Sequence, residues 1–401
     1  MKKDIIIIGA GPSGLALACL LAKLDLDIVI IEKSPLKILK NPAYDGRETA
    51  LTHPSKELLE KIGAWKNITK KAISPIHKAK VLNGFSNYSL DFENDSKKEA
   101  LGYLVSNHEI KKSIFKEVEK LSNVELITQI EVEDLKSDDE KATIYLSNNK
   151  VIESSLIAAA DSRFSKSRNK MGISTDMHDF ARNMIVCKMK HELDHQNIAL
   201  ECFYDDRVIA ALPLDGKVSS IVITVPTKKA DELVNLSEEE FNQDITNYLN
   251  DKLGKLILTS KRYSYPLVST YADKFTTTRF ALIGDAAVGM HPVTAHGFNL
   301  GLMGQNILFE EIQKALEENL DIGSDKVLEK YNKFHKKETK LMYHGTNTIV
   351  SIFTNNKLPA RILRGLMLRA ANSKFLPFKS IISNRLTGNK LSKGVFSSFL
   401  R

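Results

Sequence analysis

The 401-residue sequence predicts an α/β fold in which a mainly antiparallel β-sheet is inserted into a domain of parallel strands, with a helical segment at the C-terminus. Three observations carry this prediction. The chain opens with an apolar run, a glycine-rich turn and an apolar helix. Consecutive strand-like segments follow between residues 182 and 225, and a second apolar run at 280–283 again leads through a turn into a helix. A chain of this length can form two domains.

The N-terminal motif is typical of a Rossmann-like dinucleotide site. Ile5–Ile8 form the kind of run expected for a buried parallel strand, and Gly9, Gly11 and Gly14 follow before the helix. A second strand ends in Glu32. Glycines permit a tight turn and close backbone approach, the helix N-terminus attracts a pyrophosphate, and the acid can bind ribose hydroxyls. The strand, the helix and the acid make this motif far more specific than the glycines alone.

A secretory signal peptide is the alternative for this N-terminus, with Lys2-Lys3 as its basic region. Asp4 precedes the apolar stretch and the Gly-x-Gly-Pro turn interrupts it, which argues against a leader, so we expect a cytoplasmic protein. The composition agrees, since 43% of residues are hydrophobic, 26% are charged, and no uninterrupted apolar run could span a bilayer. The three cysteines lack the spacing of a metal site, and we expect no metal.

A second motif lies at residues 280–304. The strand-like run Phe280–Ile283 ends at Gly284-Asp285, which could present one carboxylate to a sugar hydroxyl. A turn with His291-Pro292 follows, and a helix opens at Gly297-Phe298-Asn299. The first backbone N–H groups of that helix and its positive dipole end could face an electron-rich ring edge.

Periodicity predicts the elements between the two motifs. Helices are expected at 54–62 and 109–121, and a buried strand at 156–160 precedes the segment Asp161–Arg168. Other strands are expected at 76–83, 88–92, 124–128, 130–136, 141–147, 182–189, 198–204, 207–213 and 217–225. The predicted domains are a discontinuous nucleotide-binding domain (1–75, 100–180 and 270–330), an inserted substrate domain (76–99 and 181–269) and a C-terminal helical, basic segment (331–401).

The net charge of +8 is concentrated at the C-terminus. Residues 339–401 contain eleven Lys and Arg and no Asp or Glu, so the first 338 residues carry a net charge of −3. An apolar helical stripe there is accompanied by Arg361, Arg364 and Arg369. Three interpretations stay open: a helix packed on its own domain, a contact with anionic lipid or an acidic protein, and nucleic-acid binding. The third is disfavoured because no aromatic stacking platform accompanies the charges, and we expect no nucleic-acid partner.

These motifs together resemble those of the FAD-dependent aromatic hydroxylases, the group A flavoprotein monooxygenases with the p-hydroxybenzoate hydroxylase fold. Within that group the chain resembles the ubiquinone-biosynthesis hydroxylases. The resemblance spans most of the chain, and its residues are Gly9–Gly14, Glu32, Arg47 with Ala50-Leu51-Thr52, Asp161–Arg168, Gly284–Gly301 and the C-terminal stretch 364–388.

The resemblance implies a non-covalent FAD cofactor. Gly9, Gly11 and Gly14 would approach its pyrophosphate, Glu32 its adenosine ribose, and Asp285 its ribityl chain. Pro292 would lie beside the reactive edge of the isoalloxazine ring, and His291 and His296 would lie close to the flavin, although no general base is assigned. The other implied contacts are Arg47, Asp161 and the backbone N–H groups of Gly297, Phe298 and Asn299.

Three departures from the family pattern affect the expected identity of the electron donor more than the expected binding of FAD. Asp161-Ser162 stands where the family has Asp-Gly, in a segment linked to pyrophosphate and nicotinamide contact. Val288 stands where many relatives have histidine, and Ala295-His296-Gly297 replaces the common Gly-Gln-Gly. The donor expected from the family is NAD(P)H.

The implied reaction is hydroxylation of the aromatic ring of a polyprenylated ubiquinone precursor with O₂, through a flavin C4a-hydroperoxide. Proteins of a ubiquinone-synthesis complex and the inner face of the cell membrane would be partners. The alternatives are a flavoprotein hydroxylase of another aromatic substrate and a flavin-bearing, non-catalytic subunit of a biosynthetic complex. An isoprenoid reductase or a halogenase is disfavoured, because those relatives tend to carry tryptophan-rich signatures and the only tryptophan here is Trp65.

The basic C-terminal segment predicts peripheral membrane binding that depends on salt. Each basic residue near an anionic leaflet contributes about 1 kcal/mol, so wild-type protein should float with anionic liposomes at low salt and less at high salt. The triple variant Arg361→Glu/Arg364→Glu/Arg369→Glu should float much less. Equal flotation of the variant and the wild type would contradict the electrostatic attraction.

Overall fold

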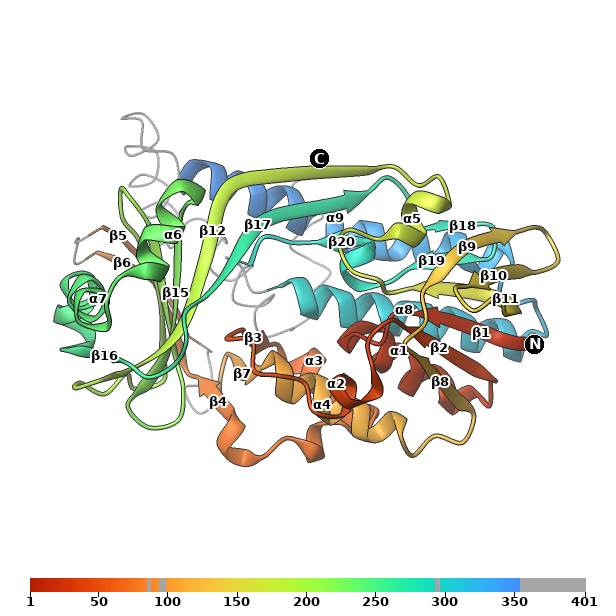
Figure 1. The fold of residues 1–401 in the computed structure, drawn as a ribbon, viewed down its shortest axis with the longest axis horizontal. Coiled ribbons are helices and arrows are strands. Elements are labelled where there is room, and N and C mark those ends of the chain that lie inside the picture. Colours follow the sequence, from red (N-terminus) through yellow and green to blue (C-terminus); the bar gives the residue numbers. More distant parts are fainter. Residues whose placement is uncertain (85–87, 94–98, 293–295, 354–401) are drawn as a thin grey trace, which may run out of the picture.

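The structure is a computed structural model that describes residues 1–84, 88–93, 99–292 and 296–353. Three β-sheets organise these residues (Figure 1). A mainly parallel sheet lies at one end of the molecule, a larger and mainly antiparallel sheet (called the antiparallel sheet below) lies at the other, and a small sheet lies between them. None of the described helices is long and apolar enough to cross a membrane.

The parallel sheet has the strand order β18-β19-β11-β1-β2-β8, and the antiparallel strands β9 and β10 extend it beside β11. Side chains of β1 at Ile5, Ile6 and Ile7 are fully buried, in a core to which helix α1 and strands β9 and β10 also contribute. The bounds are β1 (Lys2–Ile8), β2 (Ile28–Glu32), β8 (Val124–Thr128), β9 (Val132–Ser137), β10 (Ala142–Leu146), β11 (Val151–Ala159), β18 (Thr276–Thr277) and β19 (Phe280–Leu282).

The helices around this sheet form its hydrophobic core together with the strands. α1 begins directly after Gly11 with a proline in its first turn, where a missing N–H costs nothing. The helices and turns are α1 (Pro12–Leu21), η1 (Ala22–Leu24), α2 (Leu36–Lys40), α3 (His53–Lys61), η2 (Trp65–Asn67), η3 (Lys70–Ala72), α4 (Asn107–Val118), α5 (Lys166–Lys170), η4 (Gly284–Ala286), α8 (Gly297–Glu317) and α9 (Asp325–Phe353).

The antiparallel sheet has the order β20-β17-β12-β15-β14-β13-β5-β6, with β16 beside β12. Two helices, α6 (Thr227–Asn235) and α7 (Glu238–Leu253), cover its outer face, on the far side from α8 (Figure 1). The strands are β5 (Lys78–Asn83), β6 (Ser89–Glu93), β12 (Thr175–His191), β13 (Ile198–Phe203), β14 (Val208–Pro213), β15 (Val218–Pro226), β16 (Leu256–Leu258), β17 (Tyr263–Ala272) and β20 (Val288–Gly289).

The inner face of the antiparallel sheet packs against the small sheet, whose order is β3-β7-β4. Its strands are β3 (Glu48–Leu51), β4 (Ile73–Ile76) and β7 (Gly102–Ser106). A separate apolar cluster fills this junction, with Leu104 of β7 and Phe203 of β13 among its buried members. The small sheet therefore lies between the antiparallel sheet and the elements that follow the N-terminal motif.

β12 is longer than the sequence pattern predicts. The pattern predicts a strand at 182–189, whereas β12 runs for 17 residues from Thr175 to His191. Its first part is mostly exposed, so no buried alternation marks it in the sequence. Pairing with β17 shifts register between Asp179 and Asn183, and Ala181 within that bulge has a left-handed φ of 51°.

The strands predicted at 76–83, 88–92, 198–204, 207–213 and 217–225 are confirmed within a few residues by β5, β6, β13, β14 and β15. The loop predicted after Glu32 contains the short helix α2 and the strand β3, and the helices α6 and α7 carry no sequence prediction. At the C-terminus, α9 begins at Asp325, ahead of the predicted boundary at residue 331. The basic stripe at residues 361–370 lies outside the described residues.

Candidate functional site

Three parallel strands bring the two sequence motifs together at their carboxyl ends. Ile8 of β1 pairs with Ala159 of β11, and Ala159 in turn pairs with Leu282 of β19. The segments that follow these strands begin at Gly9, Ala160 and Ile283, so they emerge at one edge of the sheet. Ligands of α/β proteins bind at such carboxyl edges.

Close backbone contacts explain the glycines at this edge. Gly9 has a φ of 103°, and a Cβ there would lie 2.7 Å from the Ala160 carbonyl oxygen. A Cβ at Gly14 would lie 2.0 Å from the Gly9 carbonyl oxygen, so only glycine lets α1 approach the turn. Gly284 approaches Ser13 equally closely, since its Cβ would lie 2.5 Å from the serine Oγ. The two motifs are therefore in direct contact.

The N-terminus of α1 is available for an anion. Its N-cap is Gly11, and no side chain among the described residues caps it. The first-turn N–H groups are thus left for another acceptor, which a pyrophosphate would supply. The nearby Glu32 carboxylate accepts the Ala10 N–H through Oε2 (2.7 Å) and the Ser34 N–H through Oε1 (2.8 Å). These bonds fix the acid beside the glycine turn, as a ribose-binding role requires.

Asp285 has a partner that the sequence motif does not identify. Arg163 donates from Nη2 to Asp285 Oδ2 (2.9 Å) and from Nη1 to the Val268 carbonyl oxygen (2.7 Å). The Asp285 side chain keeps 39% of its surface exposed, so the carboxylate is oriented by the arginine while it still faces open space. Arg163 lies in the Asp161–Arg168 segment, but an ion pair between segments this far apart has no local sequence signal.

Asp161 supports the N-terminus of the short helix α5, whose N-cap is Ser165. Its carboxylate accepts hydrogen bonds from the Ser165 hydroxyl and from the Ser167 N–H (3.0 Å). Ser162 occupies the family's glycine position with a φ of 83°, in the left-handed region that disfavours a side chain. Arg168 is buried and donates to the Ala286 carbonyl (2.9 Å), which ties this turn to the segment that carries Asp285. Contact between Asp161 and a cofactor stays a prediction.

The start of α8 is held by its own third residue. Asn299 accepts the Thr52 N–H through Oδ1 (3.0 Å) and donates from Nδ2 to the Ala50 carbonyl (2.8 Å). The side chain of Asn299 thereby ties the first turn of α8 to the end of β3. His296 occupies the N-cap and makes no side-chain cap.

His291 and Pro292 lie at the turn before α8. Pro292 is exposed, whereas His291 is buried against the Phe180 ring, with 4.6 Å between the ring centroids. Burial, reinforced by the nearby Arg182 and Arg163, lowers the pKa of His291 to about 4. The imidazole is therefore neutral at pH 7, and His291 adds no positive charge to the turn before α8.

Arg47 lies on the loop that leads into β3. Its guanidinium pairs with Asp45 (2.6 Å) and lies over the Tyr265 ring, 5.3 Å from the centroid. Asn107 also donates to the Asp45 carboxylate (2.7 Å), so the loop is anchored to the start of α4. The Arg47 and Asn107 contacts hold the pKa of Asp45 below its usual range despite burial. This arrangement places Arg47 at the junction with the antiparallel sheet.

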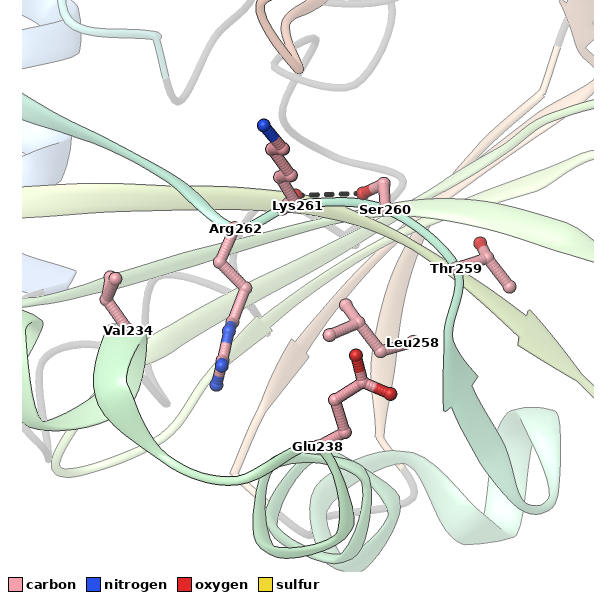
Figure 2. Close-up of a pocket in the computed structure, with 7 residues that line it drawn as sticks. All are labelled: Val234, Glu238, Leu258, Thr259, Ser260, Lys261 and Arg262. Atoms are coloured by element: carbon pink, nitrogen blue, oxygen red, sulfur yellow. Dashed lines mark hydrogen bonds between the residues drawn. The ribbon is translucent and has the colours of Figure 1, made fainter.

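A groove of about 580 Å³ opens elsewhere, between α6, α7 and the β16–β17 connection (Figure 2). One of its two cationic residues, Arg262, donates to the carbonyls of Leu233 (3.1 Å) and Leu236 (2.7 Å) and lies over the Phe241 ring. Arg262 thus caps the C-terminus of α6. The groove lies on the outer side of the antiparallel sheet and contains none of the predicted site residues.

Comparison with known proteins agrees with this geometry. Residues 2–342 match the model of a family described as an FAD binding domain. The chain belongs to this family. It is 47% identical to "Ubiquinone hydroxylase UbiM" of Neisseria meningitidis, over 97% of this chain and 85% of that protein. It is 29% identical to "Ubiquinone hydroxylase UbiL" of Rhodospirillum rubrum, over 96% and 89%.

Among solved structures, the fold is similar to that of p-nitrophenol 4-monooxygenase from Pseudomonas putida. The TM-score is 0.76 with 17% identity, and the match covers 97% of this chain and 100% of the other. The predicted fold class is therefore confirmed.

The residues present fit the cofactor of this FAD-binding family. Gly9 and Gly14 form a cradle that a Cβ would fill, and the uncapped α1 N-terminus lies beside it. Glu32 and Asp285 place carboxylates at two points of the same sheet edge, and the start of α8 adds a second set of N–H groups. This donor set suits an extended ligand with a pyrophosphate, ribose hydroxyls and an electron-rich ring.

Loss of the Asp285 carboxylate should weaken FAD retention. A hydrogen bond to a charged group contributes about 1.5–3 kcal/mol, so Asp285→Ala should raise the dissociation constant about 10- to 100-fold. The flavin content after extensive dialysis, read from absorbance, measures this change. Asp273→Ala is a control in an acid outside the site. A full flavin complement in Asp285→Ala would contradict the assignment.

The left-handed backbone at Ser162 predicts a stabilising substitution. Ser162→Gly should relieve a strain of about 1–2 kcal/mol, offset by about 0.5–1 kcal/mol of glycine entropy in the unfolded chain. Ser162→Ala keeps the Cβ and the strain, and it is the matched comparison. Urea unfolding should give Ser162→Gly the larger free energy of unfolding. If Ser162→Gly is the less stable variant, the left-handed conformation is wrong.

Proposed function

We propose that this protein is an FAD-dependent monooxygenase that hydroxylates the aromatic ring of a polyprenylated ubiquinone precursor with O₂. The observation that carries the proposal is 47% identity over 97% of the chain to a protein named as a ubiquinone hydroxylase. The glycine cradle and the two carboxylates at one sheet edge support the cofactor. The inserted antiparallel sheet supplies an apolar face on which a lipophilic ring could bind.

The site residues divide according to the part of FAD that they would hold. Gly9, Gly11 and Gly14 bring the α1 N–H groups to the pyrophosphate, and Glu32 accepts the adenosine ribose hydroxyls. Asp285, oriented by Arg163, accepts a ribityl hydroxyl. Arg47 contacts the cofactor from its loop. Both carboxylate oxygens of Asp161 accept hydrogen bonds from the α5 turn, so Asp161 would act by holding that turn beside the cofactor.

Bound FAD would supply the activation of O₂ that ring hydroxylation needs. The chain contributes positive potential from the N–H groups of Gly297, Phe298 and Asn299, because a helix N-terminus stabilises nearby negative charge. Asn299 keeps that terminus against β3. His291, neutral and packed on Phe180, helps to exclude water beside Pro292. His296 lies at the N-cap, where its ring would adjoin the cofactor.

NAD(P)H is the electron donor that we propose. Ser162 replaces a glycine in the segment that the family pattern links to nicotinamide contact. The preference of this protein for NADH or NADPH therefore has to be measured. We also propose that the basic segment beyond residue 353 brings the enzyme to the inner face of the cell membrane or to a ubiquinone-synthesis complex. A precursor with a polyprenyl chain resides in lipid, which supports this location.

Deletion of the protein should change the quinone pool. Cells that lack it, grown with oxygen, should accumulate an under-hydroxylated prenylphenol and contain less ubiquinone, as measured by mass spectrometry. Wild-type protein should restore ubiquinone, and Asp285→Ala should restore less of it. A non-catalytic subunit predicts instead no NAD(P)H oxidation by the purified flavoprotein with a prenylphenol. Normal ubiquinone in a strain without a redundant hydroxylase would indicate another aromatic substrate.

A further inference from the structure

One carboxyl group lies on the apolar inner face of the antiparallel sheet. Glu201 is the fourth residue of β13, and its cross-strand partners are Val81 of β5 and Ala210 of β14. Along β13 itself, its neighbours on the same face are Ala199 and Phe203. All four surrounding side chains are apolar.

The alternation of β13 fixes the direction of Glu201. Leu200 and Cys202 belong to the core beneath α6 and α7, on the outer face. Ala199 and Phe203 belong to the inner cluster that contacts the small sheet. Because successive side chains of a strand point to opposite faces, Glu201 points inward with these two residues. It is partly exposed, so this part of the inner face borders open space.

The Glu201 carboxyl has no hydrogen-bond donor among the described residues, and burial among apolar groups raises its pKa to about 8. At pH 7 the group is therefore mainly neutral, with one O–H donor and one carbonyl acceptor to satisfy. Burying such a group without a partner is unfavourable. A carboxyl in this position needs a polar group from a ligand or from water.

The inner cluster beside this carboxyl extends to β3, which contacts the start of α8. Ala50 of β3 packs against the same inner cluster, and its carbonyl accepts the hydrogen bond from Asn299 at the start of α8. Ala50 thus contacts both the inner cluster and, through its carbonyl, the helix that would contact the flavin ring. A ring bound along this cluster near α8 would contact apolar side chains.

We propose that Glu201 binds a hydroxyl group of the aromatic ring of the substrate, an inference that rests on the proposed function. The prenyl chain cannot satisfy a carboxyl group, whereas a phenol offers one donor and one acceptor that match it. The apolar side chains around Glu201 would contact the aromatic ring and the first part of the prenyl chain.

Binding of a phenol and its methyl ether tests the contact without turnover. The probes are 2-prenylphenol and 2-prenylanisole, titrated into the FAD-loaded enzyme while the flavin spectrum is followed. Wild type should bind the phenol at least about 10-fold more tightly than the ether, the factor expected for one hydrogen bond to a carboxyl. Glu201→Leu should bind both within about threefold of each other, because the hydroxyl then has no partner. Glu239→Leu, a matched change on the exposed surface of α7, should keep the wild-type ratio.

The outcomes separate the two proposals. If wild type binds neither probe, the proposed substrate class fails and this inference fails with it. If wild type prefers the phenol and Glu201→Leu keeps that preference, only the role of Glu201 is overturned. Glu201→Leu should fold, because it places an apolar group among the apolar neighbours of this position.

The pH dependence of unfolding provides a second readout with Glu201→Gln. The pKa of Glu201 is raised from 4.5 to about 8 in the folded protein, so the native state retains a proton that the unfolded chain loses. The free energy of unfolding of the wild type should therefore fall, relative to Glu201→Gln, as pH rises from 4.5 to about 8. Parallel pH profiles would show that the carboxyl is solvated, and they would overturn its place in an apolar site.

Discussion

The structure depends on the parallel pairing of β11 with β1 on one side and with β19 on the other. This register places the ends of strands from the beginning, middle and later part of the chain at one edge of a single sheet. The N-terminal glycines, the Asp161 turn and the Asp285 segment are useful only in combination, and none of them could assemble a site alone. The Arg168 bond to the Ala286 carbonyl and the Arg163 pair with Asp285 then fix two of these segments to each other.

The sequence predicts well those elements whose signals are local. Ile5–Ile8 and Phe280–Ile283 are apolar runs bounded by glycine, and α1 and α8 begin where the motifs place them. The residue types of each local segment also indicate which ligand groups it could bind, because a turn or a strand end needs particular residues. Family resemblance then supplies the cofactor, which periodicity alone does not identify.

Elements that depend on distant partners are the ones that the pattern does not reveal. α6 and α7 are amphipathic helices of modest propensity, and they form because they bury one face on the outer side of the antiparallel sheet. The ion pair of Arg163 with Asp285 requires the register of β11 and β19. Glu201 is the one charged residue of β13, and only the pairing with Val81 and Ala210 shows that its neighbours on the adjacent strands are also apolar.

The bulge divides the long strand β12 into two parts that have different pairing partners. Before the bulge, β12 pairs with β17 alone, and from Arg182 onward it pairs with β15 as well. A left-handed alanine costs about 1–2 kcal/mol, and Ala181 adopts that conformation with its N–H bound to the Asp179 carboxylate (2.8 Å). The bend gives Phe180 its position against His291 at the turn before α8. The strained residue Ala181 therefore lies at the bend that orients the antiparallel sheet relative to the start of α8.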